Sequence, residues 1–172
     1  MHKHILILLL TLGAVALLAG CPVQKQGSGT QATKSAQLTS PENQAKDFEY
    51  TLFDGASHKL SDNFGQPLVV NFWADWCPPC VAELPHFEEV WKEKSGQFNI
   101  VAIAVKNAQN PQGFVKDQGF TMPFATDING ADTYGITGIP VTLFIAKDGS
   151  LVDQVVGGMD RATFESKLAQ IL

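Results

Sequence analysis

The chain has 172 residues, of which 45% are hydrophobic and 17% are charged, and its formal net charge at pH 7 is −5. This mildly acidic balance, without any basic cluster, argues against nucleic-acid binding, because phosphate recognition depends on grouped lysine and arginine side chains.

The N-terminus is typical of an export signal, which we assign to residues 1–20. Residues 2–4 provide a basic start, residues 5–18 an apolar stretch, and small residues follow. The apolar stretch is short for a membrane-spanning helix, and no basic stop-transfer cluster follows it. Leu18-Ala19-Gly20-Cys21 resembles a bacterial lipobox, which implies cleavage before Cys21 and lipid on its sulfur and new amino group. An ordinary signal peptide or an uncleaved anchor would export the domain as well.

Residues 21–46 are rich in Gln, Ser, Thr, Gly and Ala and contain almost no large apolar side chains. Such a segment buries too little surface to offset the entropy of the chain, so we expect a flexible tether. Residues 47–172 remain, and they are enough for one compact domain with its own core.

Strands and helices alternate along this domain. In chain order we expect a hairpin of strands 48–52 and 57–60 with its turn at Asp54-Gly55, a buried strand 69–73, a helix 79–94 and an apolar strand 99–105. A helix 110–119 capped by Asn110, paired strands 141–146 and 151–156, and a last helix capped by Asp160 follow. This order predicts an α/β fold, with a mixed central sheet and helices on both faces.

The segment Trp76-Cys77-Pro78-Pro79-Cys80 directly follows the buried strand and opens the first long helix. A sulfur at a helix N-terminus is stabilised as a thiolate by free N–H groups and by the helix dipole. We therefore expect Cys77 to be the exposed nucleophile of low pKa. Cys80, one turn further, is expected to be the buried thiol that closes an intramolecular disulfide.

The cysteine pair allows two other interpretations. A structural zinc site needs four ligands, and beyond Cys21 only His58 and His86 could complete it, by accident of folding. A purely structural disulfide would close so short a loop that it would constrain the unfolded chain little. Redox chemistry is favoured, and it requires neither a metal nor another cofactor.

The order of elements, the cysteine motif and the later Gly138-Ile139-Pro140-Val141-Thr142 together resemble the thioredoxin superfamily. Within it, the chain is similar to the TlpA/ResA-type branch of exported, membrane-anchored thiol:disulfide reductases. The resemblance runs from Phe48 to the C-terminus. It includes the N-terminal hairpin and an inserted stretch, residues 107–134, that distinguish this branch from plain thioredoxin.

Several site assignments follow from this resemblance. It implies that Pro140 is cis and lies beside the Cys77 sulfur, whereas the local pattern alone also allows a trans strand-edge proline. It leaves the backbone of Ile139 free to pair with an extended substrate segment. Trp76 and Pro78 complete the predicted substrate contacts, although Trp76 could equally serve packing.

The resemblance also directs attention to Glu83. Asn71 stands where thioredoxins usually carry a buried acid, and an amide cannot take up a proton at neutral pH. Glu83 matches a glutamate of the ResA-type branch, which implies that it manages the proton of Cys80. The alternative is an ordinary solvated helix residue, as we expect for Glu88 one turn further on.

The main functional hypothesis is a reductase of oxidised exported proteins, including apocytochrome c during cytochrome c maturation. Pro78 and Pro79 offer no side-chain donor and no N–H to a Cys77 thiolate, which favours a reducing couple. The resemblance implies a membrane thiol reductase of the DsbD/CcdA kind as the electron donor. The domain would act on the periplasmic or extracytoplasmic side of a membrane.

Rival functions on the same fold are a thiol peroxidase and a copper-delivery module. A peroxidase typically carries a threonine shortly before its attacking cysteine, whereas Ala74-Asp75-Trp76 precede Cys77 here. A copper module needs a histidine besides the cysteine pair, and after that pair the domain offers only His86.

Overall fold

The computed structural model describes residues 43–172. The predicted signal peptide, lipidation of Cys21 and most of the predicted tether lie outside the described residues. Within the described range, no helix combines the length and the apolar character needed to cross a membrane.

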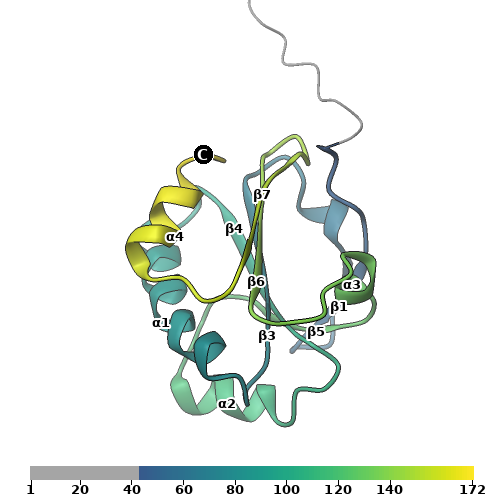
Figure 1. Ribbon diagram of the computed structural model, residues 1–172, viewed down its shortest axis with the longest axis vertical. Coiled ribbons are helices and arrows are strands. Elements are labelled where there is room, and N and C mark those ends of the chain that lie inside the picture. Colours follow the sequence, from purple (N-terminus) through teal and green to yellow (C-terminus); the bar gives the residue numbers. More distant parts are fainter. Residues whose placement is uncertain (1–42) are drawn as a thin grey trace, which may run out of the picture. The chain divides into compact units, whose positions relative to one another are not determined.

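A mixed sheet of seven strands forms the centre of the fold, in the order β2-β1-β5-β4-β3-β6-β7 (Figure 1). The strands are β1 (Glu49–Leu52), β2 (Ser57–Lys59), β3 (Leu68–Trp73), β4 (Asn99–Ala104), β5 (Phe124–Asp127), β6 (Val141–Ile145) and β7 (Leu151–Val156). β3, β4 and β5 run parallel, and the other neighbouring pairs are antiparallel. The predicted mixed α/β sheet is confirmed.

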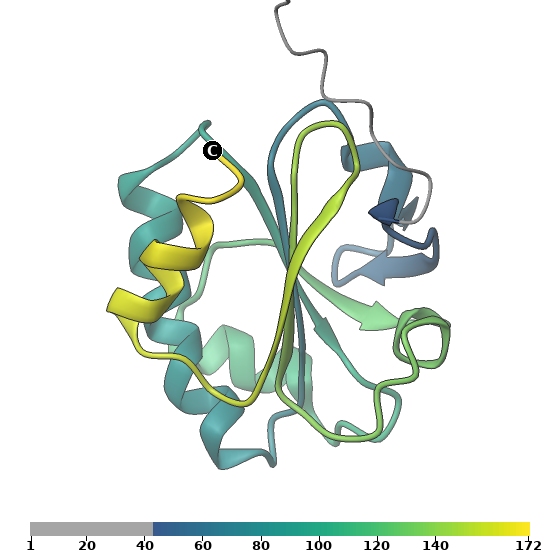
Figure 2. The same ribbon diagram turned by 45° about the horizontal axis from the view of Figure 1, so that its top comes forward.

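Helices cover both faces of this sheet. They are α1 (Pro78–Glu93), α2 (Pro111–Gln118), α3 (Gly130–Thr133) and α4 (Arg161–Leu168), with a short 3-10 turn η2 (Leu60–Asn63). Figures 1 and 2 show α1, α2 and α4 on one side of the sheet and α3 on the other. The predicted caps are confirmed, since Asn110 and Asp160 accept main-chain hydrogen bonds at the starts of α2 and α4.

β3 shows why the sheet divides the core in two. All six of its residues are buried, and alternate side chains enter different apolar clusters. Val69 and Trp73 pack on the α1 side, whereas Val70 and Phe72 pack on the α3 side. Asn71 shares the parity of Val69 and Trp73, so β3 presents one polar side chain toward α1.

The stretch 107–134 holds more structure than its sequence pattern indicates. β5 and α3 lie within it, and neither was predicted. Both elements have only four residues, and β5 gains its order from distant partners, pairing with β1 on one side and β4 on the other. β5 thereby joins the N-terminal hairpin to the rest of the sheet.

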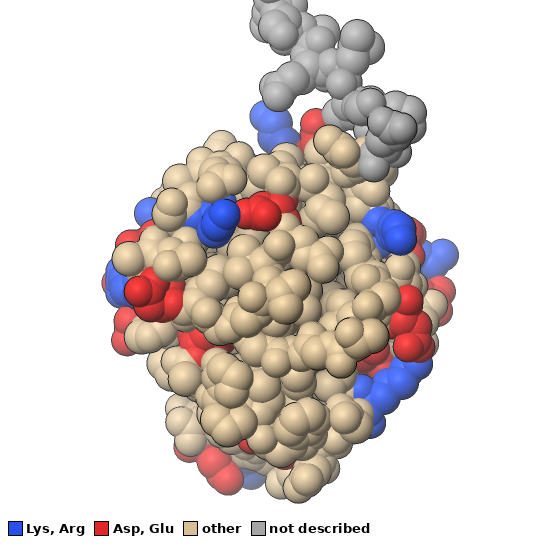
Figure 3. All heavy atoms as spheres, in the orientation of Figure 1, with Lys and Arg blue, Asp and Glu red and all other residues tan. Residues whose placement is uncertain are grey.

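The described chain begins at the end of the sheet opposite the start of α1. Gln44 forms a bridge to Ser150, and the N–H of Ala45 donates to the carbonyl of Gly149 at 2.9 Å. These partners belong to the turn between β6 and β7, which lies beside the first described residues in Figures 1 and 2. Figure 3, in the orientation of Figure 1, shows charged side chains mainly around the periphery of the visible face and few at its centre.

Candidate active site

Cys77 and Cys80 form a disulfide at the start of α1, with a Cα–Cα distance of 5.3 Å. The N–H of Cys77 donates to the carbonyl of Ala74 at 3.2 Å, which closes the turn between β3 and the helix, and Cys77 is the N-cap. Pro78 and Pro79 occupy the first helical positions and have no N–H. The first main-chain N–H of the helix is therefore that of Cys80.

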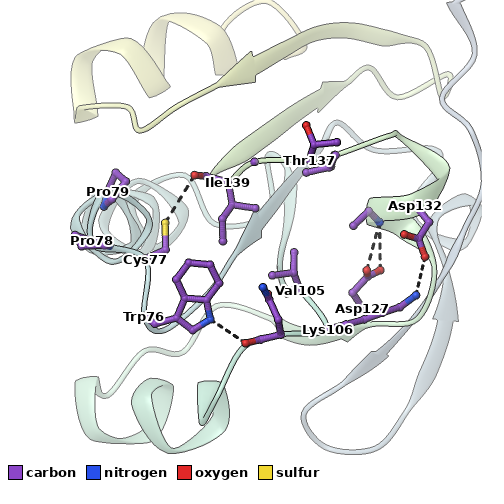
Figure 4. Close-up of a pocket in the computed structure, with 14 residues that line it drawn as sticks. Trp76, Cys77, Pro78, Pro79, Val105, Lys106, Asp127, Asp132, Thr137 and Ile139 are labelled. Atoms are coloured by element: carbon purple, nitrogen blue, oxygen red, sulfur yellow. Dashed lines mark hydrogen bonds and ion pairs between the residues drawn. The ribbon is translucent and has the colours of Figure 1, made fainter.

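The exposure of Cys77 differs from the prediction, whereas that of Cys80 agrees with it. Cys80 is fully buried, as expected, but Cys77 is only 4% exposed and is not the open nucleophile that the sequence predicts. Trp76 and Ile139 line the same cavity as Cys77. Cys77 reaches solvent through this cavity of about 540 Å³, which it helps to line (Figure 4).

The loop before β6 lies against the reactive sulfur. The Ile139–Pro140 peptide bond is cis, as the resemblance implied. The Cys77 Sγ lies 3.8 Å from the carbonyl oxygen of Ile139 (Figure 4). Within residues 43–172, the main chain of Ile139 enters no backbone–backbone hydrogen bond, so its polar groups remain free for an extended partner.

Trp76, Pro78 and Ile139, the predicted substrate contacts, all line the cavity beside Cys77. Trp76 is 44% exposed, and its indole N–H donates to the carbonyl of Asn107 at 2.8 Å. This hydrogen bond fixes the ring at the rim of the cavity rather than in the core. Contact of these residues with a substrate remains a prediction.

Glu83 is buried on the inner face of α1, with 1% of its surface exposed. Its Oε1 accepts from the Nδ2 of Asn71 at 2.8 Å, and its Oε2 accepts from the N–H of Met159 at 3.0 Å. Burial raises the pKa of Glu83 to about 7, because desolvation of the carboxylate outweighs the hydrogen bonds from Met159 and Asn71. The solvated alternative is excluded by this burial.

The partners of Glu83 were only partly visible in the sequence. Asn71 also donates to the Oγ1 of Thr142 at 3.0 Å, and these two residues face each other across β3 and β6. Thr142 interrupts an otherwise apolar strand, a signal that could have drawn attention to it. Met159 acts through its main chain, which no residue pattern reveals. The neighbouring Gly158 allows the loop before α4 to lie close to the start of α1, because a Cβ there would be 3.3 Å from the Pro79 carbonyl oxygen.

Glu88 is not the solvated residue that the sequence predicts. It is 5% exposed and accepts hydrogen bonds from the N–H and hydroxyl of Thr121 and the N–H of Met122, at 2.7 to 2.9 Å. Its carboxylate also pairs with Lys92 at 2.7 Å. Burial raises its pKa less than these partners lower it, so the pKa lies below the usual range for glutamate. Glu88 ties the segment before β5 to α1.

This arrangement offers two sulfurs that can exchange electrons as a pair and one buried carboxyl that can hold a proton at neutral pH. Within residues 43–172, no three His, Cys, Asp or Glu side chains converge as ligands of a metal ion would.

Comparisons with known proteins agree with this chemistry. Residues 40–172 match the model of the Redoxin family. The thiol-disulfide oxidoreductase ResA of Halalkalibacterium halodurans is 36% identical over 128 residues, covering 71% of this chain and 72% of that protein. The thioredoxin-like protein YneN of Bacillus subtilis is 32% identical over 130 residues, covering 73% of this chain and 76% of that protein.

Solved structures give the same result. An exposed lipoprotein thioredoxin from Streptococcus pneumoniae is 30% identical, with a TM-score of 0.64, over 73% of this chain and 99% of its own. A thiol:disulfide interchange protein from Chlorobium tepidum is 32% identical, with a TM-score of 0.65, over 75% of this chain and 95% of its own. The order of the strands, the cysteine pair and the similarity to these proteins lead to one conclusion. The chain belongs to the Redoxin family and is a thiol-disulfide oxidoreductase of the ResA type with a thioredoxin-like fold.

Proposed function

We propose that the protein reduces disulfides in exported proteins, with Cys77 as the attacking and Cys80 as the resolving thiol. The observation that carries this proposal is the position of the pair, with Cys77 opening onto the cavity and Cys80 fully buried behind it. A substrate sulfur can reach the first cysteine and not the second. The order of attack follows from access.

The reaction balances without a cofactor. The Cys77 thiolate attacks one sulfur of a substrate disulfide, forming a mixed disulfide and releasing the other substrate sulfur, which takes up a proton. The Cys80 thiolate then attacks the Sγ of Cys77 and releases the second substrate thiol. Two electrons pass to the substrate, and the Cys77–Cys80 disulfide remains.

Glu83 is the proposed acceptor of the Cys80 proton. It lies one helical turn beyond Cys80, where residues three apart share a helix face. Burial holds its pKa at about 7, so it takes up and returns a proton near neutral pH. Asn71, at the thioredoxin acid position, orients this carboxyl by its hydrogen bond and cannot itself accept the proton.

The direction of electron flow is inferred from the helix start. Pro78 and Pro79 remove the first two N–H donors that would otherwise stabilise a Cys77 thiolate. A less stabilised thiolate gives a more reducing pair, since a strong oxidant owes its potential to a stabilised reduced form. A pair of this kind in an oxidising compartment needs a source of electrons, for which we propose a membrane thiol reductase of the DsbD/CcdA kind.

Location at the extracytoplasmic face of a membrane is part of the proposal. It rests on the signal and lipobox pattern ending at Cys21 and on the similarity to a pneumococcal exposed lipoprotein. Oxidised apocytochrome c, during cytochrome c maturation, is the substrate we propose within this compartment.

Redox titration of the cysteine pair tests the direction of flow. A reductase should have a potential close to the value of about −270 mV typical of thioredoxin, whereas a value near about −120 mV would mark an oxidant and refute the proposal. Trapping tests the roles. Cys80→Ser should accumulate mixed disulfides with substrate proteins and Cys77→Ser should not, and equal trapping by both variants would contradict the assignment.

A further inference from the structure

The cavity beside Cys77 has two unlike ends (Figure 4). Around the sulfur its walls are apolar, formed by Trp76, Val105 and Ile139 (Figure 4). Its far end is charged and is formed by Lys106, Asp127 and Asp132. A substrate side chain that enters this cavity beside the reacting disulfide would therefore contact apolar groups near the sulfur and charged groups at the far end.

The charged end carries more negative than positive groups. Lys106 pairs with Asp132 at 2.7 Å, and both side chains are largely exposed, at 56% and 75%. Asp127 is only 5% exposed. Its Oδ1 accepts from the N–H of Gly130 at 2.7 Å, whereas its Oδ2 has only a 3.4 Å contact with the N–H of Ala131. One carboxylate oxygen thus retains capacity for a further donor.

We propose that this cavity binds a lysine or arginine side chain of the substrate polypeptide close to its reacting cysteine. The inference rests on the proposed exchange at Cys77 and names the class of substrate. Lysine and arginine bury a long aliphatic stem against apolar surface while their charged end stays with polar groups. That division matches the order of the cavity lining, from Trp76 and Ile139 to Asp127 and Asp132.

A cation fits this end better than an anion does. An acidic side chain would need Lys106, whose ammonium already faces Asp132, and it would approach the buried Asp127 carboxylate without a compensating charge. Like charges brought together in a partly desolvated site repel strongly. A basic side chain would instead share the two carboxylates with Lys106. The net charge of the chain, −5, also favours the approach of cationic substrate segments.

The position of the basic residue follows from strand geometry. An extended substrate segment that pairs with the free main chain of Ile139 would turn alternate side chains toward the protein. When its cysteine meets Cys77, the residues two positions away face the same surface. We therefore place the basic residue two positions before or after the reacting cysteine.

The test uses the full-length protein in detergent and peptides with one cysteine, held as a mixed disulfide with 2-mercaptoethanol. Lysine, glutamine or glutamate stands two positions to either side of that cysteine. With reduced protein, we expect the lysine peptide of one series to react about threefold to tenfold faster than the glutamine peptide, and the glutamate peptide to react more slowly. This preference should shrink as salt screens the charges.

Variants assign the preference to the cavity. Asp132→Asn should lower the ratio of lysine to glutamine rates, and Lys106→Gln should raise it, because each changes the charge at the far end in the opposite sense. Asp117→Asn alters an exposed carboxylate on α2, away from the cavity lining, and should leave the ratio unchanged. Equal rates for the three peptides, or a faster glutamate peptide, would overturn the inference. An undiminished lysine preference in Asp132→Asn would overturn it as well.

A reverse experiment separates this inference from the proposed function. The oxidised protein is mixed with the same peptides as free thiols, and the rate of attack on Cys77 is measured. If the protein is an oxidant rather than a reductase, it should oxidise the lysine peptide thiol faster than the glutamine peptide thiol. The proposed reduction of substrate disulfides would then be wrong although the lysine preference is correct. If the protein instead reduces the mixed disulfides but reacts equally fast with the lysine and glutamine peptides, the proposed function is correct and this inference is wrong.

Discussion

Replacing Glu83 by glutamine should make the protein more stable at neutral pH. Glutamine keeps the volume of the side chain and removes the charge. The oxygen Asn71 Oδ1, which has no hydrogen-bond partner in the described part of the chain, can receive the new amide donor if the Asn71 amide rotates. The buried site therefore accepts glutamine without leaving the introduced donor unpaired.

The magnitude follows from the pKa of Glu83, which burial raises from 4.5 to about 7. Between these values the folded protein keeps the proton while the unfolded chain loses it, so the folded state binds more protons and stability falls as pH rises. The full shift corresponds to at most about 3 kcal/mol. Glu83→Gln has no group that titrates at this position. Its free energy of unfolding relative to wild type should therefore increase by up to about 3 kcal/mol as the pH rises from 4.5 to about 7, and should then stay constant.

Urea denaturation of the oxidised protein near pH 4.5 and above pH 7 measures this difference, since the other titrating groups are shared and cancel. Glu49→Gln, at an exposed position of β1, is the matched control and should follow wild type at both values. If the difference between Glu83→Gln and wild type were the same at both values, Glu83 would have no raised pKa. In the reduced protein the variant should also slow disulfide exchange, by about a hundredfold if general base catalysis operates.

Three further predictions concern other positions. Glu88→Gln should destabilise the fold by about 1–3 kcal/mol, measured by urea denaturation, because it removes a charge that pairs with Lys92 and accepts hydrogen bonds from the segment before β5, while exchange kinetics should match wild type. Pro79→His should raise the reduction potential by about 30 mV or more, since an imidazolium and a restored N–H would stabilise the Cys77 thiolate, and an unchanged titration would refute that account of direction. Cys21→Ala should move the protein from the membrane fraction to the soluble fraction, and a wild type found wholly in the soluble fraction would contradict the anchor.

The sequence predicts the elements whose signals are local. The hairpin turn at Asp54-Gly55, the caps of α2 and α4, and the apolar runs of β3 and β4 were all placed within a few residues. Elements held by distant partners were not predicted. β5 has four residues, and what makes it a strand is its position between β1 and β4. No local period carries that information.

The candidate site shows the same division. The cysteine pair and Pro140 were identified by motif and resemblance, whereas the burial of Cys77 in a cavity that Trp76 and Ile139 also line was not predicted. The charged end of the cavity comes from three separate segments: Lys106 follows β4, Asp127 ends β5, and α3 contributes Asp132. Such a convergence becomes visible only when the topology is known.

The two buried glutamates of α1 show why sequence distance cannot separate a working acid from a structural one. Glu83 and Glu88 lie on the same helix and are almost equally buried, yet their pKa values move in opposite directions. Among the described residues, Glu83 has two hydrogen-bond donors and no cationic partner, so desolvation prevails and the carboxyl can be protonated at neutral pH. Glu88 has three donors and Lys92, which hold it ionised. A group that stays ionised cannot deliver a proton near pH 7. The partners of each carboxylate, more than its depth, therefore support the proposal that Glu83, and not Glu88, takes up the proton of Cys80.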